Sequence, residues 1–483
     1  MKSVLFVALL GLWGWGAQVS FAQSPAANTP PKNDSLHTAR RIRQRRPGFQ
    51  ATVDSLKRAK IDAFELRVNF NAKGTSFARF NFWNQVWLRY THLNPGSTIN
   101  GEPGSGTFDI GLRRVRMHLF ATLADRVFFY FHFGINNFNY LSARKTGAFI
   151  HDAYADFKVY KQYLALGAGL SGWNGPNRFS FPGTMTIMGL DIPLGEIATV
   201  DLNDQFVRRL TVHARGAAQG LDYRFALSQP FTLRTATGVQ QLGDVGRNEA
   251  TWSLKNPSLM GQGYVKYQFF DREDNASSLL TGTYLGKKKI LNVGAGFVYQ
   301  PRAMWYKTQS TGDTAFAPYY SASVDVYVDM PTAPGRDDCL SLYAAYMYNS
   351  FGPRYVRFLG VMNPANGFAN GQGLPYAGSY GSAFPVEGTG QVFILMGGYK
   401  FEEYLLGRAG TLMPFAHVQV SRFERLVGTT LWGEAGVSWL VLGHKAKISF
   451  SYQNRPIYRL EPDNRLVGNG RRGMYVLQLQ VGI

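Results

Sequence analysis

Hydrophobic and polar residues alternate along much of the chain from residue 79 onward. In the stretch RFNFWNQVWLRY, residues 79–90, the apolar face carries Phe80, Phe82, Val86, Leu88 and Tyr90. The opposite face carries Arg79, Asn81, Trp83, Gln85, Trp87 and Arg89. A period of two is typical of a β-strand whose two faces meet different surroundings. The stretch therefore predicts a strand with one oily side and one polar side.

The same alternation recurs in about 16 segments, an even number, as single-chain bacterial barrels require. The predicted strands are 79–92, 108–123, 127–137, 151–160, 162–171, 205–216, 220–229, 261–270, 289–301, 319–330, 338–350, 390–401, 410–423, 429–442, 445–454 and 473–483. The last of them alternates to the end of the chain and is expected to close the sheet into a barrel. We expect an all-β fold, a transmembrane antiparallel β-barrel; a secreted β-sandwich or propeller is the alternative.

The lengths of the connections separate these two folds, because an outer-membrane barrel alternates long outside loops with short periplasmic turns. The odd connections, all but one long, are 93–107, 138–150, 172–204, 230–260, 302–318, 351–389, 424–428 and 455–472. The even connections, all but 271–288 short, are 124–126, the position of Lys161, 217–219, 271–288, 331–337, 402–409 and 442–445. The long even connection is expected to hide extensions of its flanking strands. The pattern favours the membrane barrel.

The strand that contains GLRRVRMHLF, residues 111–120, places charge beside apolar residues. Alternation directs Arg114 and Arg116 to a water-filled lumen and Val115, Met117 and Leu119 to lipid. By the same parity Arg113 falls on the oily side. An arginine is tolerated there only near the interface, where it costs about 0–1 kcal/mol against about 2–4 kcal/mol at the midplane. We therefore expect Arg113 near a strand end.

The first 22 residues form an export signal: Met1, Lys2 and Ser3 precede an apolar run, and small residues at Ser20 and Ala22 suit cleavage after Ala22. Residues 23–78 form a basic, partly disordered periplasmic leader that contains the run ARRIRQRRPG at 39–48. Residues 79–483 form the barrel. The localisation expected is the outer membrane of a Gram-negative bacterium.

Composition and charge narrow the classes of function. The chain has a net charge of +20, and its aromatic residues make up 14% of it. Export and the lack of a nucleic-acid motif argue against nucleic acid as the partner of this charge. The single cysteine, Cys339, allows no internal disulfide. Ser, His and Asp form no catalytic cluster or elbow, so an enzyme is not expected.

A family resemblance follows from the order of three motifs: FDIGLRRVRMHLFATLADRVFFYFHFGI, IHDAYADFKVYKQYLALGAGL and NDQFVRRLTVHARGAAQGLDYRFAL. Over residues 108–229 this order resembles the phosphate-selective porin O and P family. The resemblance implies an outer-membrane porin, and it suggests a homotrimer. The family's Gly-Gln-Phe-Lys-x-Pro-like sequence has no lysine in its counterpart here, LGAGLSGWNGPNRFSFPG, so phosphate specificity is not carried over.

The third outside loop, 172–204, is expected to fold into the lumen and narrow the channel, as the resemblance also implies. Its candidate constriction residues are Arg178, Asp191 and Glu196. The loop carries apolar residues that an exposed loop would rarely hold, namely Met185, Ile187, Met188, Leu190, Ile192 and Leu194. The alternative is a surface loop that grips a partner subunit.

Lumen-facing cations give the predicted channel its bias. The candidate lining residues are Arg114, Arg116, Lys158, Arg209, Arg215, Arg224, Lys266, Lys445 and Lys447. Fixed positive charge lowers the entry barrier for anions. Lumen-facing acids can instead pair with these cations and stiffen the wall: Asp152, Asp156, Asp222, Asp325 and Asp329.

A hairpin that turns at Asp125 pairs residues whose numbers sum to 250, and so places His118 opposite His132. The pair is a weak candidate for a metal site, because no third ligand lies in register, and a plain polar wall is favoured.

The sequence thus predicts a porin in the outer-membrane lipid that passes small anionic or polar solutes by diffusion, phosphate-like anions among them. No cofactor is expected, because diffusion follows the solute gradient. The alternative is a structural or secretion-associated barrel with a blocked lumen that acts through partner proteins. Conductance separates the two.

Overall fold

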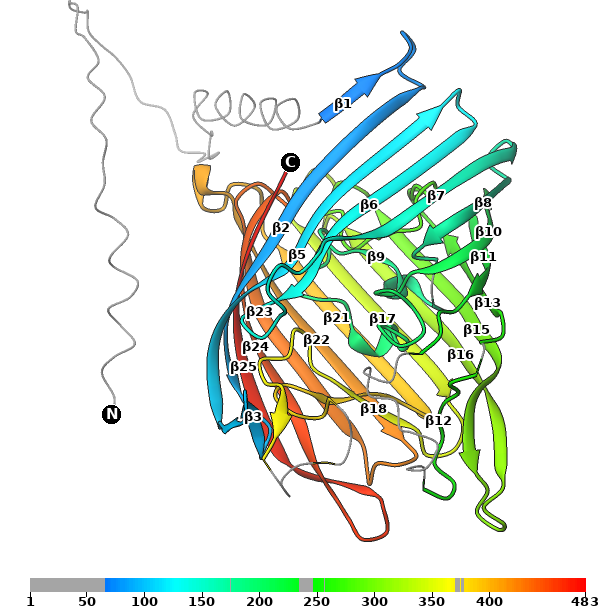
Figure 1. The fold of residues 1–483 in the computed structure, drawn as a ribbon. Helices are drawn as coiled ribbons and strands as arrows, with labels where there is room; N and C mark the ends of the chain where they lie inside the picture. The colour runs from blue at the N-terminus through cyan, green and yellow to red at the C-terminus, as the bar shows by residue number, and fades with distance from the viewer. Residues whose placement is uncertain (1–65, 174, 234–245, 256, 370–373, 375–377) are drawn as a thin grey trace, which may run out of the picture. The chain divides into compact units, whose positions relative to one another are not determined.

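The computed structural model describes residues 66–483 except 174, 234–245, 256, 370–373 and 375–377. These residues form a closed antiparallel barrel of 16 strands and contain no α-helix (Figure 1). The barrel strands are β2 (Phe77–His92), β5 (Gly106–Leu123), β6 (Val127–Phe138), β7 (Phe149–Tyr160), β8 (Leu164–Ser171), β10 (Arg209–Ala218), β11 (Leu221–Gln229), β13 (Met260–Gln268), β15 (Ile290–Lys307), β16 (Thr314–Met330), β17 (Cys339–Ser350), β21 (Gly390–Lys400), β22 (Thr411–Phe423), β23 (Thr430–Leu440), β24 (Ala446–Leu460) and β25 (Leu466–Gly482).

The remaining elements are short and lie at the barrel ends or in the connections. They are β1 (Leu66–Asn69), β3 (Ser97–Ile99), β4 (Glu102–Pro103), β9 (Pro182–Gly183), β12 (Thr251–Trp252), β14 (Leu280–Thr281), β18 (Val356–Leu359), β19 (Gly367–Phe368), β20 (Phe384–Gly388) and the 3₁₀ turns η1 (Arg178–Ser180), η2 (Leu194–Glu196) and η4 (Gly407–Ala409). The predicted signal peptide and most of the predicted leader, residues 1–65, lie outside the described residues. β1 falls within the predicted leader range and pairs antiparallel with β2.

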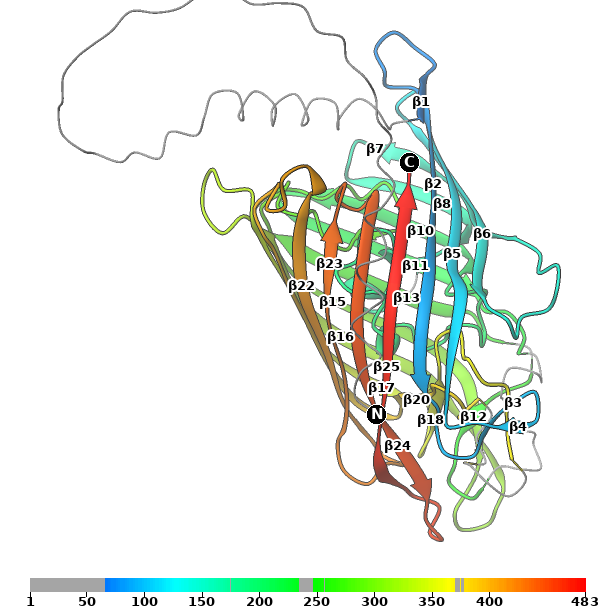
Figure 2. The same ribbon diagram turned by 90° about the vertical axis from the view of Figure 1, so that its left-hand side faces the viewer.

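The barrel closes where the last strand meets the first, as predicted. β25 pairs antiparallel with β2 from Trp83↔Gly482 to Thr91↔Met474, and Figure 2 shows the two strands side by side. Closure is required in lipid because no water is present there to satisfy the backbone groups of an edge strand. The end of the barrel that holds the C-terminus and the short turns is the periplasmic end by the convention of such barrels.

Each predicted strand is present, and two hairpins are longer than predicted. In the first hairpin, β15 continues to Lys307 and β16 begins at Thr314. In the second, only residues 461–465 separate β24 from β25. The predicted loops 302–318 and 455–472 are therefore largely strand. Beyond the membrane both faces of a hairpin meet water, so the alternation on which the prediction rests disappears while the backbone pairing continues.

The outer face of the barrel is apolar. Its exposed side chains include Phe82, Ile110, Val212, Phe225, Val293, Val324, Leu342, Leu395, Leu431, Phe450 and Leu479. Trp83 and Trp87, on the predicted polar side, are buried inside. An apolar outer band around a closed barrel is the outer-membrane architecture, and it agrees with the predicted localisation in a Gram-negative outer membrane. Within the described residues no helix has the length and hydropathy to span a membrane.

Outward-facing tyrosines and phenylalanines form contacts near both ends of the strands. Toward the outside, Tyr320 and Tyr348 lie 6.0 Å apart and Tyr452 and Tyr475 lie 4.9 Å apart between ring centroids. Toward the periplasm, Tyr267 contacts Phe269 and Tyr399 contacts Phe401. Aromatic girdles of this kind occupy the two membrane interfaces of outer-membrane barrels and fix their depth in the bilayer.

We expect a charge in the apolar band to destabilise the barrel. Val324 lies within β16, faces outward and is 55% exposed. Val324→Arg should lower the free energy of unfolding by about 2–4 kcal/mol, and Thr314→Arg, at the exposed tip of the same strand, by about 0–1 kcal/mol. Urea unfolding from lipid vesicles, followed by tryptophan fluorescence, measures both. Equal losses would contradict this placement of the membrane.

Candidate solute pathway

The segment between β8 and β10, residues 172–208, lies inside the barrel, as predicted for the third outside loop. It reaches opposite walls: Gln480 of β25 donates to the carbonyl of Met185 at 3.0 Å, and Gln262 of β13 donates to the carbonyl of Trp173. Its apolar residues Ile187, Met188 and Leu190 are buried. Packing against the wall therefore accounts for the hydrophobic residues of this loop, and the surface-loop alternative is wrong.

Arg113 does not face lipid, and this part of the sequence prediction is wrong. The pairing of β2 with β5 shifts by one residue, from Gln85↔Arg114 to Val86↔Leu112, so Arg113 is the extra residue of a β-bulge. A bulge re-aims the side chain of the inserted residue. Arg113 is 3% exposed, and its guanidinium donates to Asp191 at 2.7 Å. Two successive arginines thus point into the lumen.

Asp191 receives both arginines and fixes the loop to the wall. Arg113 binds one carboxylate oxygen, Arg114 binds the other, and Arg114 also donates to Gln85 at 2.8 Å. Burial alone would raise the pKa of Asp191, but the two guanidinium charges outweigh it and hold the pKa below its usual range. The aspartate is therefore a fixed negative charge between two fixed positive ones.

A second segment enters the lumen from the periplasmic end. Residues 269–289, which join β13 to β15, do not extend those strands as predicted. The part from Glu273 to Leu285 folds inward, and β14 there pairs in parallel with β9 of the loop. A buried ion pair joins the two segments, with Arg178 donating to Glu273 at 2.7 and 2.8 Å. We call residues 269–289 the strap.

The carboxylate of Glu273 accepts hydrogen bonds from three further side chains besides Arg178. Lys266 donates to it at 2.5 Å, Asn292 at 2.6 Å and Tyr284 at 2.9 Å. Burial would raise the pKa of Glu273, and the charges of Arg178 and Lys266 lower it well below its usual range. Arg178 also lies 3.7 Å above the ring centre of Tyr327. The predicted constriction residue Arg178 is therefore engaged in holding the loop to the strap.

A third segment inside the barrel belongs to the connection between β17 and β21. Its strand β20 is buried, with Phe384 stacked on Trp432 of β23 at 5.8 Å. Arg357 donates to the carbonyls of Ala198 and Val200, at 3.1 and 2.7 Å. This connection therefore packs on the loop 172–208 from the outside end.

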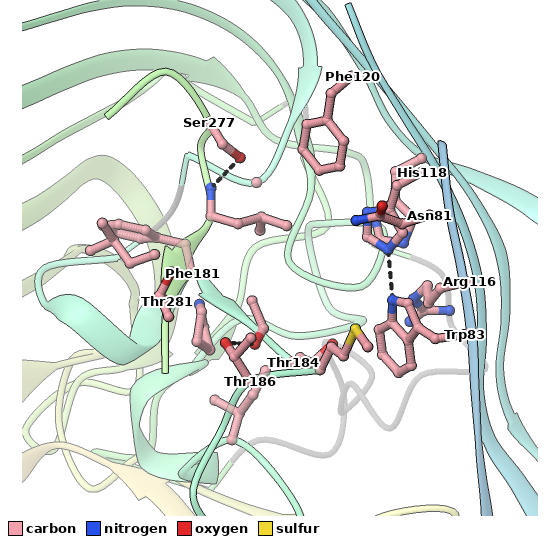
Figure 3. A pocket seen from close by; sticks show the side chains of 18 of the residues that line it. Asn81, Trp83, Arg116, His118, Phe120, Phe181, Thr184, Thr186, Ser277 and Thr281 are labelled. Carbon is pink, nitrogen blue, oxygen red and sulfur yellow. Dashed lines mark hydrogen bonds between the residues drawn. The ribbon is translucent and has the colours of Figure 1, made fainter. Parts of the chain in front are cut away.

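Of the cavities lined by the described residues, two bear on a path through the barrel. The periplasmic cavity, of about 300 Å³, lies between the wall formed by β2, β5 and β6 and the loop with its strap (Figure 3). The outside cavity, of about 630 Å³, is lined by residues of the connections near Asn139, Leu202, Arg357 and Tyr380. The two cavities share no lining residue. Arg113 and Arg114 are buried and line neither of these cavities. Asp191 lines a third, smaller cavity of about 30 Å³ together with Trp87 and His417.

Most of the predicted lining cations are buried and paired. Arg209 pairs with Asp204 at 3.1 Å, Arg215 with Asp156 at 2.6 Å, Arg224 with Asp222 at 3.4 Å and Lys266 with Glu273 at 2.5 Å. Lys447 is buried and donates to the carbonyl of Ile187 at 3.2 Å. Lys158 is exposed near the periplasmic end of β7, and Lys445 lies in the turn before β24.

Arg116 differs from the four cations that have a carboxylate partner. It is 1% exposed and lines the periplasmic cavity. Its guanidinium donates to the carbonyl of Ile135 at 2.8 Å, to the carbonyl of Val115 at 3.2 Å and to the amide oxygen of Asn136. Among the described residues no carboxylate pairs with it, and its buried Nε has no hydrogen-bond partner.

The predicted acids divide into two groups. Asp152, Asp156 and Asp222 pair with cations: Asp152 accepts from Arg208 at 3.1 Å. Asp325 instead accepts from the hydroxyl of Tyr264 at 2.9 Å, and Asp329 from Tyr327 at 3.0 Å. The candidate constriction residue Glu196 is buried, and burial raises its pKa well above the usual range.

Two functional residues escaped the sequence analysis. Arg208 lines the periplasmic cavity, yet alternation assigned only Arg209 to the lumen. β10 begins at Arg209, so Arg208 precedes the strand and strand parity does not govern it. Glu273 was missed because its segment was assigned to strand extensions. The sequence did contain a signal for Glu273: it is an acidic residue within an unusually long periplasmic connection.

His118 and His132 are cross-strand partners, as the sum rule predicts. Their rings stack with centroids 4.0 Å apart, and His132 stacks in turn on His151 at 4.7 Å. Both nitrogens of His118 are engaged, one by Trp83 at 3.0 Å and one by Tyr130 at 2.6 Å. In the part of the chain that the structure describes, no group of three or more His, Cys, Asp or Glu side chains is arranged for a metal ion.

Comparison with known proteins supports the fold. No protein-family model and no curated protein matches the chain. Pseudomonas putida OprB, solved at high pH, has a TM-score of 0.50 at 10% identity, covering 84% of this chain and 94% of that chain. Salmonella typhi OmpF in complex with daunomycin has a TM-score of 0.46 at 10% identity, covering 84% and 98%. A Rhodopseudomonas blastica porin mutant has a TM-score of 0.42 at 9% identity, covering 84% and 100%. The chain shares the barrel fold of OprB.

The buried pair between loop and strap gives a prediction about stability. Glu273→Gln leaves Arg178 and Lys266 buried without a carboxylate, so we expect the free energy of unfolding to fall by about 3–5 kcal/mol at neutral pH. The exposed pair of Arg459 with Glu461, at 2.8 Å, is the control, and Glu461→Gln should lose about 0–1 kcal/mol. Urea unfolding at pH 7 measures both.

The pH dependence of the same pair follows from its pKa. Because folding lowers the pKa of Glu273, its contribution is complete above the ordinary glutamate value of about 4.3 and is lost only as the solution becomes strongly acidic. The difference between the native protein and Glu273→Gln should therefore stay constant from pH 5 to pH 7. A difference that vanished within that range would show that the pair does not hold the loop.

Proposed function

We propose that the protein is an outer-membrane channel, not an enzyme, through which small solutes diffuse with a preference for anions. The barrel fold shared with OprB supports channel function in general. The two cavities, one toward each end of the barrel, provide wells from which a solute would enter and leave. Flow down a concentration gradient needs no cofactor.

Arg116 is the observation on which the anion preference rests. A buried guanidinium without a carboxylate partner in the described chain presents its positive charge to the periplasmic cavity. Charge in a pore of low dielectric acts more strongly than charge in water. An anion in this cavity would meet an attractive potential, and a cation a repulsive one.

The sharing of acids adds to this charge. Arg113 and Arg114 share the single carboxylate of Asp191, and Arg178 and Lys266 share Glu273. Two cations for one acid leave one net positive charge at each cluster. The buried acids without a cation partner in the described residues, such as Glu196, have raised pKa values and so oppose this charge less. Phosphate-like anions are among the solutes that the resemblance suggests, and a homotrimer is the expected assembly.

One observation favours a second candidate, a barrel with a blocked lumen that acts through partner proteins. The loop 172–208, the strap and strand β20 of the connection 351–389 all pack inside the barrel, where Asp191 is buried with its two arginines. Such a barrel would insert without conducting.

The decisive experiment is the zero-current potential of the purified protein in a planar bilayer under a KCl gradient. We expect steady conductance with a potential of anion-selective sign. Arg116→Gln should reduce the chloride-to-potassium permeability ratio, since it removes the uncompensated charge. Arg302→Gln, on the exposed outer rim where Arg302 lies over the ring of Phe316, should leave the ratio unchanged. Insertion without conductance would support the blocked barrel.

The loop anchor makes a separate prediction. Asp191→Asn removes the one carboxylate that Arg113 and Arg114 share, so two guanidinium charges remain uncompensated. We expect a stronger anion preference and larger current fluctuations, because the loop loses its charged contact with β5. Single-channel recording measures both. A preference that weakened instead would show that these arginines do not act on the permeating ion.

A further inference from the structure

We infer that the periplasmic cavity is a binding site for a monosaccharide that carries one acidic group, a carboxylate or a phosphate ester. The inference rests on the proposed function and adds to it a solute class and a place. Figure 3 shows the two sides of the cavity: Asn81, Trp83, Arg116, His118 and Phe120 on the barrel wall, and Thr184, Thr186, Ser277 and Thr281 on the loop and strap.

Both sides of the cavity carry positive charge. Arg79 and Arg116 lie on the wall, Arg208 lies at the end of the loop and Lys288 lies on the strap, against the single carboxylate of Asp274. Arg208 is partly neutralised by Asp152, whereas Arg116 has no carboxylate partner in the described chain. The Nε atom of Arg116 is buried without a hydrogen-bond partner, and so is the Nε2 atom of His132 on the same wall. Buried polar atoms are rarely left unpaired. The Nε–H of Arg116 requires an acceptor on the ligand, whereas Nε2 of His132, whose Nδ1–H donates to Asp152 at 2.9 Å, requires a donor such as a sugar hydroxyl.

The loop and the strap also supply neutral hydrogen-bonding groups. Thr184, Thr186, Ser277 and Thr281 place hydroxyls along the loop and the strap (Figure 3). A hydroxyl donates one hydrogen bond and accepts others, as the hydroxyls of a sugar also do. The Thr184 side chain has no hydrogen bond within the described residues, while Thr186 donates to the carbonyl of Gly183 at 2.8 Å. The rings of Phe120 and Phe181 add apolar surface for the C–H face of a pyranose.

The volume selects between a bare oxyanion and a larger molecule. A tetrahedral oxyanion displaces about three waters, roughly 90 Å³ at about 30 Å³ for each water. The cavity measures about 300 Å³, which is the lower end of the range for organic ligands, about 300–1,000 Å³. An inorganic anion bound at Arg116 would leave the hydroxyl side unfilled. A monosaccharide with one acidic group reaches both sides.

Isothermal titration calorimetry of the detergent-folded protein tests this inference with four probes: glucuronate, glucose 6-phosphate, glucose and inorganic phosphate. We expect the two charged sugars to bind, and glucose and phosphate to bind about tenfold to a hundredfold more weakly, since each lacks one set of contacts. Equal binding of phosphate would reduce the site to one for bare anions and overturn the inference. Equal binding of glucose would overturn the inference that the solute must carry an acidic group.

Two variants separate the two halves of the site. Arg116→Gln should weaken both charged sugars about tenfold or more, because it removes a charge-assisted contact. Thr184→Val should weaken both charged sugars and leave phosphate unchanged, and it lies in the loop, where no strand pairing depends on it. Arg302→Gln is the matched control. Charged sugars that bind all three variants as they bind the native protein would place the site elsewhere.

Calorimetry needs no current, so the outcome is independent of whether the channel conducts. Anion-selective conductance without binding of any probe would overturn this inference and leave the proposed function standing. Binding of the charged sugars by a protein that never conducts would overturn the proposed function and support the cavity as a binding site.

Discussion

The pairing of β2 with β25 is the constraint on which the structure depends. In lipid an unpaired strand edge would leave a row of backbone amides and carbonyls without partners, so the sheet must close. Closure then fixes which side chains face lipid and which face the lumen. The outward side chains form the apolar band, and the buried arginines, acids and histidines of the strands face the interior. The many charged side chains inside the barrel are thus a consequence of its closure by β2 and β25.

Many of the buried charges are neutralised by ion pairs between different segments of the chain, and not only between neighbouring strands. Arg113 and Arg114 on the wall meet Asp191 on the loop, and Arg178 on the loop meets Glu273 on the strap. Burying a charge is unfavourable unless it is paired and hydrogen-bonded. Each pairing therefore ties a flexible connection to a rigid strand or to another connection. Arg116 lacks such a tie in the described chain, as do the buried Lys447 and Arg455, and of these three cations only Arg116 lines the periplasmic cavity.

The strands and their order could be predicted because lipid on one side and water on the other impose a period of two. The register of the first hairpin followed from the position of its turn, and His118 faces His132 as expected. Arg113 could not be predicted, because one inserted residue reverses parity and no pattern marks a bulge. The strap could not be predicted either, since its residues pack on the loop and not on a membrane. Ion-pair partners far apart in sequence, such as Arg178 and Glu273, leave no periodic signal.

The segments inside the barrel also bear on the order of assembly. The loop 172–208, the strap and the connection 351–389 all precede β21, and the strands from β21 to β25 are joined by short turns. A sheet that grows in chain order thus acquires its contents before its final five strands arrive. Those strands would wrap around an interior already held together by Arg178 and Glu273, and the barrel would never pass through an empty closed form.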